Sequence, residues 1–136
     1  MPTWTSPHCP ENHGYSPLDT GLRRIRYTPG SDLDFLDWRQ GSGNTVEILH
    51  IQVDSRRRQG IGRWLINQLL DHADLPEGTR LVWAVTRADN LIAQLFYEEL
   101  RFRVVGVLRN FYGTRTERGT ECVDAVMYGR DVGSQA

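Results

Sequence analysis

The sequence has no lysine, only two cysteines and two methionines, and no long apolar run. All 16 basic residues are arginine, and with 17 acidic residues they give a formal net charge of -1. A chain with so little net charge has no overall field that attracts nucleic acid or an anionic membrane, and neither partner is expected. No stretch approaches the roughly 18 apolar residues of a membrane-spanning helix. Any anion that the chain binds must therefore be held by a local group of residues.

The cysteines and histidines form no recognisable framework. Cys9 and Cys122 are far apart in the sequence and match no disulfide or zinc-binding spacing, which favours a reducing, cytoplasmic setting. His8, Cys9 and His13 lie close together but lack a fourth ligand, so we expect no metal site.

The 136 residues are enough for one domain with a single core. Residues 1–20 are rich in Pro, Gly, Ser and Asn and carry no signal-peptide pattern, so a flexible leader is expected there. One domain is expected over 21–131, followed by a short tail over 132–136.

Hydrophobic periodicity predicts several strands and two helices. The expected strands are 22–29, 33–40, 45–53, 81–86, 102–108 and 122–129. Helices are expected over 60–72 and, after the N-cap Asp89, over 89–100. Their buried faces are expected to consist of Ile61, Trp64, Leu65, Leu69 and Leu70 in the first helix and of Ile92, Leu95, Phe96 and Leu100 in the second. This order predicts an α/β (α+β) fold with helices packed on a mixed sheet.

A cationic loop, SRRRQGIGR, leads from the third predicted strand into the first predicted helix. Unpaired backbone N–H groups gather at such a helix start, and the helix dipole adds partial positive charge there. Gly60 and Gly62 let a ligand approach the backbone closely, and Arg57, Arg58 and Arg63 add guanidinium groups suited to phosphate oxygens. The loop therefore predicts a phosphate or pyrophosphate cradle, with a solvated arginine turn as the alternative.

The loop differs from the two commoner phosphate-binding loops. A Walker loop ends in Gly-Lys-Ser/Thr, and the chain has no lysine. The dinucleotide-binding fingerprint needs a third glycine, and Leu65 stands in its place.

Two segments together resemble the GNAT N-acetyltransferase superfamily. RRQGIG at 57–62 is similar to the Q/R-x-x-G-x-G/A signature, and DNLIAQLFYEELRF at 89–102 is similar to the N-x-x-A-x-x-x-Y-x-x-x-G-F helix that follows it in the family. The ending RNFYG…DAVMYGRD is similar to the closing strands of the ribosomal-protein N-terminal alanine acetyltransferase-like branch. The resemblance covers 44–130 and implies a GNAT-like mixed, mostly antiparallel sheet flanked by helices.

The resemblance implies transfer of acetyl from acetyl-coenzyme A (acetyl-CoA) to an amine. It places the pyrophosphate at the loop, the thioester beside the backbone before the loop, and the pantetheine arm along the second helix, with Asn90 near the pantetheine amides and Tyr97 near the sulfur. The implied coenzyme-binding residues are Ile51, Gln52, Val53, Arg57, Arg58, Gln59, Gly60, Ile61, Gly62, Arg63, Asn90 and Ala93. A phenol with a pKa of about 10 is suited to protonate the departing thiolate, which predicts Tyr97 as the catalytic acid.

The general base is left open between two residues. The glutamate that N-terminal acetyltransferases often carry on the strand before this helix is missing, because Ala84 or Val85 stands there. Glu47 is placed like the base of the histone-acetylating branch, whereas His50 titrates near neutral pH and immediately precedes the coenzyme-binding segment. Three positions apart in an extended strand, these two residues point to opposite faces unless a bulge intervenes.

The acceptor is expected to be a weakly basic amine. A site without an evident strong base favours α-amines, which are already partly neutral at pH 7. Phe111 and Tyr112 match the Tyr-Tyr pair that contacts peptide substrate in the N-terminal branch, so a protein or peptide N-terminus and a small amine both remain candidates. The alternative function is a non-catalytic CoA-binding regulatory module.

Two departures from the family pattern carry structural expectations. Only a short segment separates Leu22 from Glu47, so the pair of helices that walls one side of the family's acceptor site has no room. This shortened N-terminal half predicts an open acceptor side, or one completed by a second subunit in a homodimer. Arg101 replaces the glycine at the end of the second helix, and it must take a positive φ or end the helix differently.

Overall fold

The computed structural model describes residues 3–5, 21–27, 33–54 and 60–133. The chain divides into two compact units. The N-terminal unit comprises Pro17–Val82 with Asp131–Ala136, and the C-terminal unit comprises Trp83–Arg130 with Met1–Ser16.

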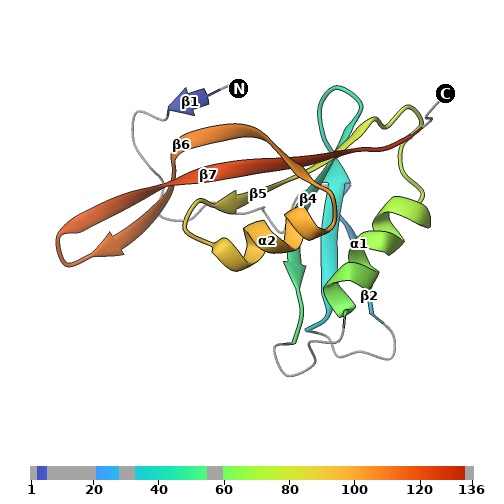
Figure 1. The fold of residues 1–136 in the computed structure, drawn as a ribbon, viewed down its shortest axis with the longest axis horizontal. Coiled ribbons are helices and arrows are strands. Elements are labelled where there is room, and N and C mark those ends of the chain that lie inside the picture. Colours follow the sequence, from blue (N-terminus) through green and yellow to red (C-terminus); the bar gives the residue numbers. More distant parts are fainter. Residues whose placement is uncertain (1–2, 6–20, 28–32, 55–59, 134–136) are drawn as a thin grey trace. The chain divides into compact units, whose positions relative to one another are not determined.

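The N-terminal unit contains an antiparallel sheet of β2 (Arg23–Arg26), β3 (Phe35–Gln40) and β4 (Thr45–Gln52), in the order β4-β3-β2 (Figure 1). The sequence predicts all three strands. One face of β3 and β4 is apolar and buried, and its members are Leu36, Trp38, Val46 and Ile48. The turn between β3 and β4 places Gly43 and Asn44 at positive φ, as the turn signal GSGN requires.

Helix α1 (Ile61–Asp71) contacts β2 and β3 and confirms the predicted first helix. Its fully buried side chains are Ile61, Leu65, Ile66 and Leu69. Trp64 and Leu70, expected on this face, are only half-buried. The Trp64 ring meets Tyr27 edge-on at 5.1 Å, which covers the end of the helix nearest Gly60.

The C-terminal unit contains β1 (Thr3–Thr5), β6 (Arg103–Thr116) and most of β5 (Leu81–Arg87) and β7 (Gly119–Asp131), in the order β1-β6-β7-β5. Strands β6 and β7 form one long antiparallel ribbon, shown in orange and red in Figure 1. Both strands extend well beyond the predicted 102–108 and 122–129, so that only residues 117–118 separate them. The sequence did not predict β1. This strand lies within residues 1–20, which were expected to be a flexible leader, and it pairs in parallel with Val107–Arg109.

Helix α2 (Leu91–Glu99) has a different buried face from the predicted one. Ile92 is 81% exposed and Leu95 is 61% exposed, whereas Tyr97 is only 5% exposed. Leu100 is buried as expected. The prediction for Ile92 and Leu95 was wrong because the broad Tyr97 ring, rather than the aliphatic positions, packs against Tyr128 of β7 and against Phe102, just before β6.

The two ends of α2 are built by specific backbone contacts. Asn90, not Asp89, is the N-cap, because its side-chain oxygen accepts a hydrogen bond from the Ala93 N–H at 3.1 Å. At the other end Arg101 takes a φ of +66°. The Phe102 N–H donates to the Tyr97 carbonyl at 2.9 Å and the Arg101 N–H donates to the Glu98 carbonyl at 3.0 Å, which is a Schellman motif. Arg101 thus adopts the positive φ that its position demanded.

These features confirm the expected fold class, a mixed and mostly antiparallel sheet with flanking helices.

The chain passes from β2 to β3 through residues 27–34, whose ends are joined by a hydrogen bond from the Tyr27 N–H to the Asp34 carbonyl at 3.1 Å. This connection is too short for a pair of helices. Among the described residues no helix is long and apolar enough to cross a membrane.

One expectation about the cysteines was wrong. Cys122, on β7, is disulfide-bonded, and the chain's other cysteine, Cys9, lies outside the described residues. Sequence spacing does not reveal which distant segments bring two thiols within bonding range.

Candidate functional site

The start of α1 presents backbone donors that no hydrogen bond within the helix uses. Gly60 is the N-cap with φ 75° and ψ 15°, and a glycine has no side-chain oxygen to cap the helix. The first backbone hydrogen bond within the helix runs from the Trp64 N–H to the Gly60 carbonyl at 2.9 Å. The N–H groups of Ile61, Gly62 and Arg63 therefore have no acceptor within the helix. No acidic residue stands in the first turn, so the positive end of the helix dipole is not neutralised there.

Part of the predicted cradle cannot be placed. Arg57, Arg58 and Gln59 lie outside the described residues, as do His8 and His13. Arg63 is described and is exposed on the first turn of α1. No group of three or more metal-ligating side chains occurs in the described part of the chain.

The end of β4 is anchored by a buried carboxylate. Asp34 is fully buried at the start of β3, and its Oδ1 atom accepts a hydrogen bond from the Asp54 N–H at 2.8 Å. This bond fixes the backbone just after Ile51, Gln52 and Val53, the segment predicted to lie beside a thioester. Sequence reasoning missed Asp34, because a buried acid has no hydrophobic signature.

A β-bulge in β4 decides how its two candidate bases are arranged. Asp37 of β3 lies opposite His50, and the next residue of β3, Trp38, lies opposite Ile48, so Leu49 is the extra residue. Arg39 lies opposite Glu47. Residues directly across a ladder share a face, and so do residues two apart on one strand.

The bulge therefore places both candidate bases on one face. Asp37 and Arg39 are two apart on β3, and their partners His50 and Glu47 share their face. The condition that the sequence left open, a bulge between Glu47 and His50, is met by Leu49.

The two candidate bases differ in what surrounds them. Glu47 Oε1 accepts a hydrogen bond from Arg39 Nε at 3.2 Å and lies 3.2 Å from Arg39 Nη2 in an ion pair, and the Glu47 side chain is 18% exposed. His50 is exposed and rests edge-on against Phe35, with ring centroids 5.3 Å apart. Glu47 is thus engaged by a cation, while the imidazole of His50 is accessible to solvent.

An ion pair that sequence reasoning missed supports this face. Asp37 is fully buried, and Arg24 of β2 donates to its two carboxylate oxygens at 2.6 and 2.9 Å. The Arg24 guanidinium also lies 3.9 Å from the centroid of the Phe35 ring. Because Phe35 contacts His50, the ion pair and the exposed imidazole belong to one packed cluster.

In the C-terminal unit, the predicted coenzyme-facing residues of α2 take separate roles. Asn90 caps the helix, with its side-chain oxygen on the Ala93 N–H. Ala93 is half-buried one turn on. Tyr97 is stacked on Tyr128, with ring centroids 5.7 Å apart and planes inclined by 22°. Burial raises the pKa of Tyr97 well above its usual range, with a smaller contribution from the nearby Tyr112.

A bulge in β6 presents the aromatic pair predicted to contact the acceptor. Between Leu108 and Tyr112 the register with β7 shifts, and the Asn110 N–H donates to Asp124 Oδ1 at 2.8 Å. Asn110 has a positive φ of 55°. The half-buried rings of Phe111 and Tyr112 meet edge-on at 5.2 Å within this irregular stretch.

Arg87, at the end of β5, is a further residue near this pair. Its guanidinium lies 5.7 Å from the centroid of the Tyr112 ring and pairs with Asp89 at 3.0 Å. Burial raises the pKa of the Tyr112 phenol, and the positive charge of Arg87 opposes that rise. The sequence contains a hint of this arrangement, an arginine and an aspartate two positions apart directly after a buried strand.

The chain is similar to known acetyltransferases. Its residues 24–102 match the Acetyltransferase (GNAT) family. A comparison with curated protein sequences finds no match. Since the family match spans more than half of the sequence, the chain belongs to the GNAT acetyltransferase family.

Solved structures share its fold. The ribosomal-protein-S18-alanine N-acetyltransferase of Escherichia coli is 24% identical, with a TM-score of 0.66 over 87% of this chain and 74% of that chain. NAA60 of Arabidopsis thaliana, in complex with a bisubstrate analogue, is 20% identical, with a TM-score of 0.62 over 74% of this chain and 65% of that chain. A Bacillus subtilis acetyltransferase in complex with CoA is 22% identical, with a TM-score of 0.61 over 73% and 68%. The first of these belongs to the branch that the sequence resembles.

Proposed function

We propose that this chain is an acetyl-CoA-dependent N-acetyltransferase whose acceptor is a protein or peptide N-terminus or a small amine. The observation that carries the proposal is the uncapped, glycine-led start of α1 directly after β4. Such a helix start binds phosphate oxygens through backbone N–H groups and the helix dipole. Similar structures support the coenzyme, since the Bacillus subtilis protein was crystallised with CoA and NAA60 with acetyl-CoA.

The proposed coenzyme contacts are those that the family resemblance implies. Gly60, Ile61, Gly62 and Arg63 would bind the pyrophosphate, together with the loop residues Arg57, Arg58 and Gln59, and the backbone of Ile51, Gln52 and Val53 would lie beside the thioester. Asn90 and Ala93 would line the pantetheine arm. A backbone N–H aimed at the developing oxyanion is worth about 3 kcal/mol of transition-state stabilisation. Residues 21–131 would act together as the acetyltransferase domain.

His50 is the proposed general base. A neutral amine must attack the thioester carbonyl, and the proton that it loses passes to a base of suitable pKa. The Glu47 carboxylate is held by Arg39, so accepting a proton would cost it that ion pair. His50 has no such partner to lose in the contacts seen here, and it projects from the same face.

Tyr97 is the proposed catalytic acid. Its raised pKa keeps the phenol protonated at neutral pH, so a proton is always present for the departing thiolate. Burial also makes a lasting tyrosinate costly, so the proton must be transferred as the carbon–sulfur bond breaks and be regained before the next cycle. Phe111 and Tyr112 would contact the acceptor.

A second candidate function is a CoA-binding module without catalysis. It is favoured by the absence of a carboxylate on β5, where Ala84 is 1% exposed in the core, and by the ion pair that occupies Glu47.

The short connection at 27–34 leaves the acceptor side without two helices, and a second copy of the chain in a homodimer would supply the missing wall.

One experiment separates these functions. Purified protein is mixed with acetyl-CoA and a panel of short peptides and small amines, and free CoA thiol is measured over time. Turnover with any acceptor supports the enzyme. Tight CoA binding by calorimetry with no turnover on the whole panel supports the module, and no CoA binding by folded protein rejects both.

The cellular location is proposed from composition alone. A cytoplasmic location was expected from the cysteine spacing, which matches no disulfide framework, but Cys122 is disulfide-bonded, which is unusual in a reducing compartment. Intact-mass measurement of the protein from cells, with thiols trapped at lysis, tests the proposal. A fully reduced Cys122 supports the cytoplasm, and a persistent disulfide argues against it.

A further inference from the structure

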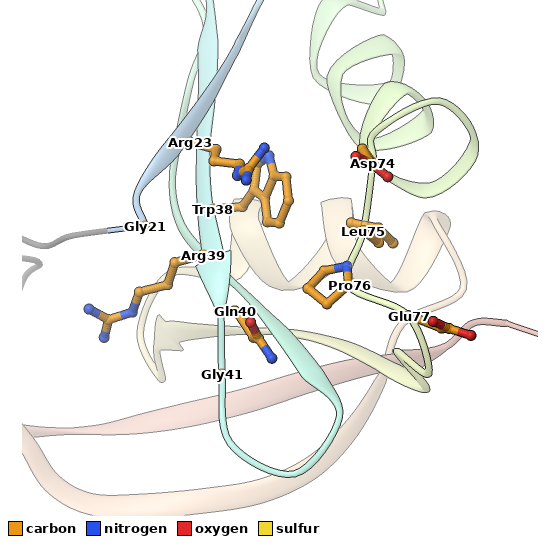
Figure 2. Close-up of a pocket in the computed structure, with 10 residues that line it drawn as sticks. All are labelled: Gly21, Arg23, Trp38, Arg39, Gln40, Gly41, Asp74, Leu75, Pro76 and Glu77. Atoms are coloured by element: carbon orange, nitrogen blue, oxygen red, sulfur yellow. The ribbon is translucent and has the colours of Figure 1, made fainter.

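A cavity of about 660 Å³ lies in the N-terminal unit, away from the start of α1. Its walls come from β3 and the start of β2, with Gly21 just before it, on one side and from Asp74–Glu77, after α1, on the other (Figure 2). Gly60 caps one end of α1, and the cavity segment follows the other end. The helix has 11 residues and is therefore about 16 Å long at 1.5 Å per residue. The cavity is thus a separate site from the proposed pyrophosphate cradle.

The floor of the cavity is apolar. Figure 2 shows the Trp38 indole facing Leu75 and Pro76 across the opening. Trp38 is 4% exposed, and both residues opposite are half-buried. Arg39, its neighbour in the lining, points to the other side of β3 and pairs with Glu47. An aliphatic or aromatic group of a ligand would therefore meet apolar surface on two sides.

The rim carries charges of both signs on opposite walls. The Arg23 guanidinium stands over the Trp38 ring, 5.7 Å from its centroid. Asp74 and Glu77 lie on the facing segment, where Figure 2 shows the Glu77 side chain directed away from Trp38, and all three charged residues are exposed. Within the described part of the chain, none of the three makes an ion pair. Their charges are therefore available to a ligand.

These features select the ligand by charge. A simple anion would be attracted to Arg23 and repelled by the acidic wall opposite. A simple cation would be attracted to that wall and repelled by Arg23. A neutral apolar molecule would partly desolvate all three charges without replacing their hydration. Only a molecule with a positive and a negative group, joined by an apolar part, satisfies both walls and the floor.

We propose that this cavity binds a free α-amino acid with an apolar or aromatic side chain. The α-carboxylate would pair with Arg23, the α-ammonium with Asp74, and the side chain would lie between Trp38 and Pro76. A volume of about 660 Å³ is within the range of small-molecule sites and holds such a ligand with room for water. The binding requires neither coenzyme nor acetyl transfer.

The test is calorimetry on the full chain with three probes of one shape. L-Phenylalanine carries both charges, 3-phenylpropanoate lacks the ammonium, and phenethylamine lacks the carboxylate. We expect phenylalanine to bind about tenfold more tightly than either analogue, because each analogue leaves the charge on one wall without a partner. Equal binding of all three, or no binding of phenylalanine, would overturn the proposal.

Two variants assign the charges. Arg23→Gln should weaken phenylalanine and 3-phenylpropanoate about tenfold and leave phenethylamine unchanged, and Asp74→Asn should do the opposite. Matched controls are Arg118→Gln at the β6–β7 turn and Asp71→Asn at the end of α1, neither of which lines the cavity. An unchanged circular dichroism spectrum shows that each variant is folded. A folded Arg23→Gln variant with full affinity for both carboxylate probes would reject the assignment.

Discussion

Asp37 on β3 and His50 on β4 lie directly opposite each other, next to the bulge at Leu49. The carboxylate of Asp37 is fully buried and paired with Arg24, whereas His50 is exposed. The ion pair therefore holds the strand position from which the imidazole projects. The bulge then determines that His50 projects on the same face as Glu47.

Replacing His50 tests its assignment as the base. His50→Gln should lower kcat about 100-fold at pH 7 and leave the Kd for acetyl-CoA unchanged, because the base acts only on the acceptor proton. Glu47→Gln is the matched comparison and should have a much smaller effect on kcat. If Glu47→Gln proves the more damaging change, the assignment of the two residues is reversed.

Replacing Tyr97 tests its role as the acid. Tyr97→Phe should lower kcat about 100-fold and change coenzyme affinity little, since the ring stays in place against Tyr128 and only the hydroxyl is lost. Steady-state kinetics and calorimetry provide the two readouts. An equal loss in turnover and in affinity would show that the hydroxyl binds the coenzyme and does not act as the acid.

The buried phenol of Tyr97 also predicts a dependence of stability on pH. Its folded-state pKa is raised above the unfolded value of about 10, so the folded state holds this proton more tightly. The resulting stabilisation is fully present below pH 10 and is lost as the pH rises through the folded-state pKa. Urea unfolding at pH 8 to 11 should show a steeper decline for the native chain than for Tyr97→Phe. Parallel curves would contradict the prediction.

Glycine at position 60 serves both the fold and the proposed cradle. Gly60→Ala should cost about 1–2 kcal/mol of unfolding free energy, because an L-residue is strained at φ 75°. Steric contact adds nothing, since no atom lies within 4 Å of the new Cβ position. The Kd for CoA should rise as the first turn of α1 shifts. Gly119→Ala, at φ 109° in the ribbon turn, is the control that shares the strain and should leave CoA affinity unchanged.

Arg101 offers the converse change. Arg101→Gly should stabilise the chain by about 0.5–1 kcal/mol, since glycine adopts the φ of +66° without strain and preserves both bonds of the Schellman motif. Arg101→Ala removes the same side chain but keeps the strained backbone, so it should change stability little. Thermal unfolding distinguishes the two variants, and equal effects would mean that the side chain, not the backbone, sets the stability.

The sequence predicted every strand but β1, the first helix and the family, because these depend on local periodicity and short motifs. It could not predict the bulge at Leu49, because a bulge is a relation between two strands. The ion pair of Asp37 with Arg24 could not be predicted for the same reason. The two residues are distant in sequence, and only the pairing of β2 with β3 brings them together.

The second helix shows a different limit. Leu91, Ile92 and Leu95 have the spacing of a buried stripe, as does the true packing set of Tyr97 and Leu100. A short helix with two apolar stripes can bury either of them. Here tertiary packing buries the stripe that carries the larger aromatic ring of Tyr97. The ribbon of β6 and β7 was likewise underestimated, because its polar outer residues pair through the backbone.

The exposed leucine and isoleucine side chains of α2 have a calorimetric consequence. Leu91, Ile92 and Leu95 are hydrated before unfolding as well as after it, so they add little to the heat capacity change of denaturation. The unfolding free energy of the chain therefore curves less with temperature than the number of apolar residues in α2 alone would predict.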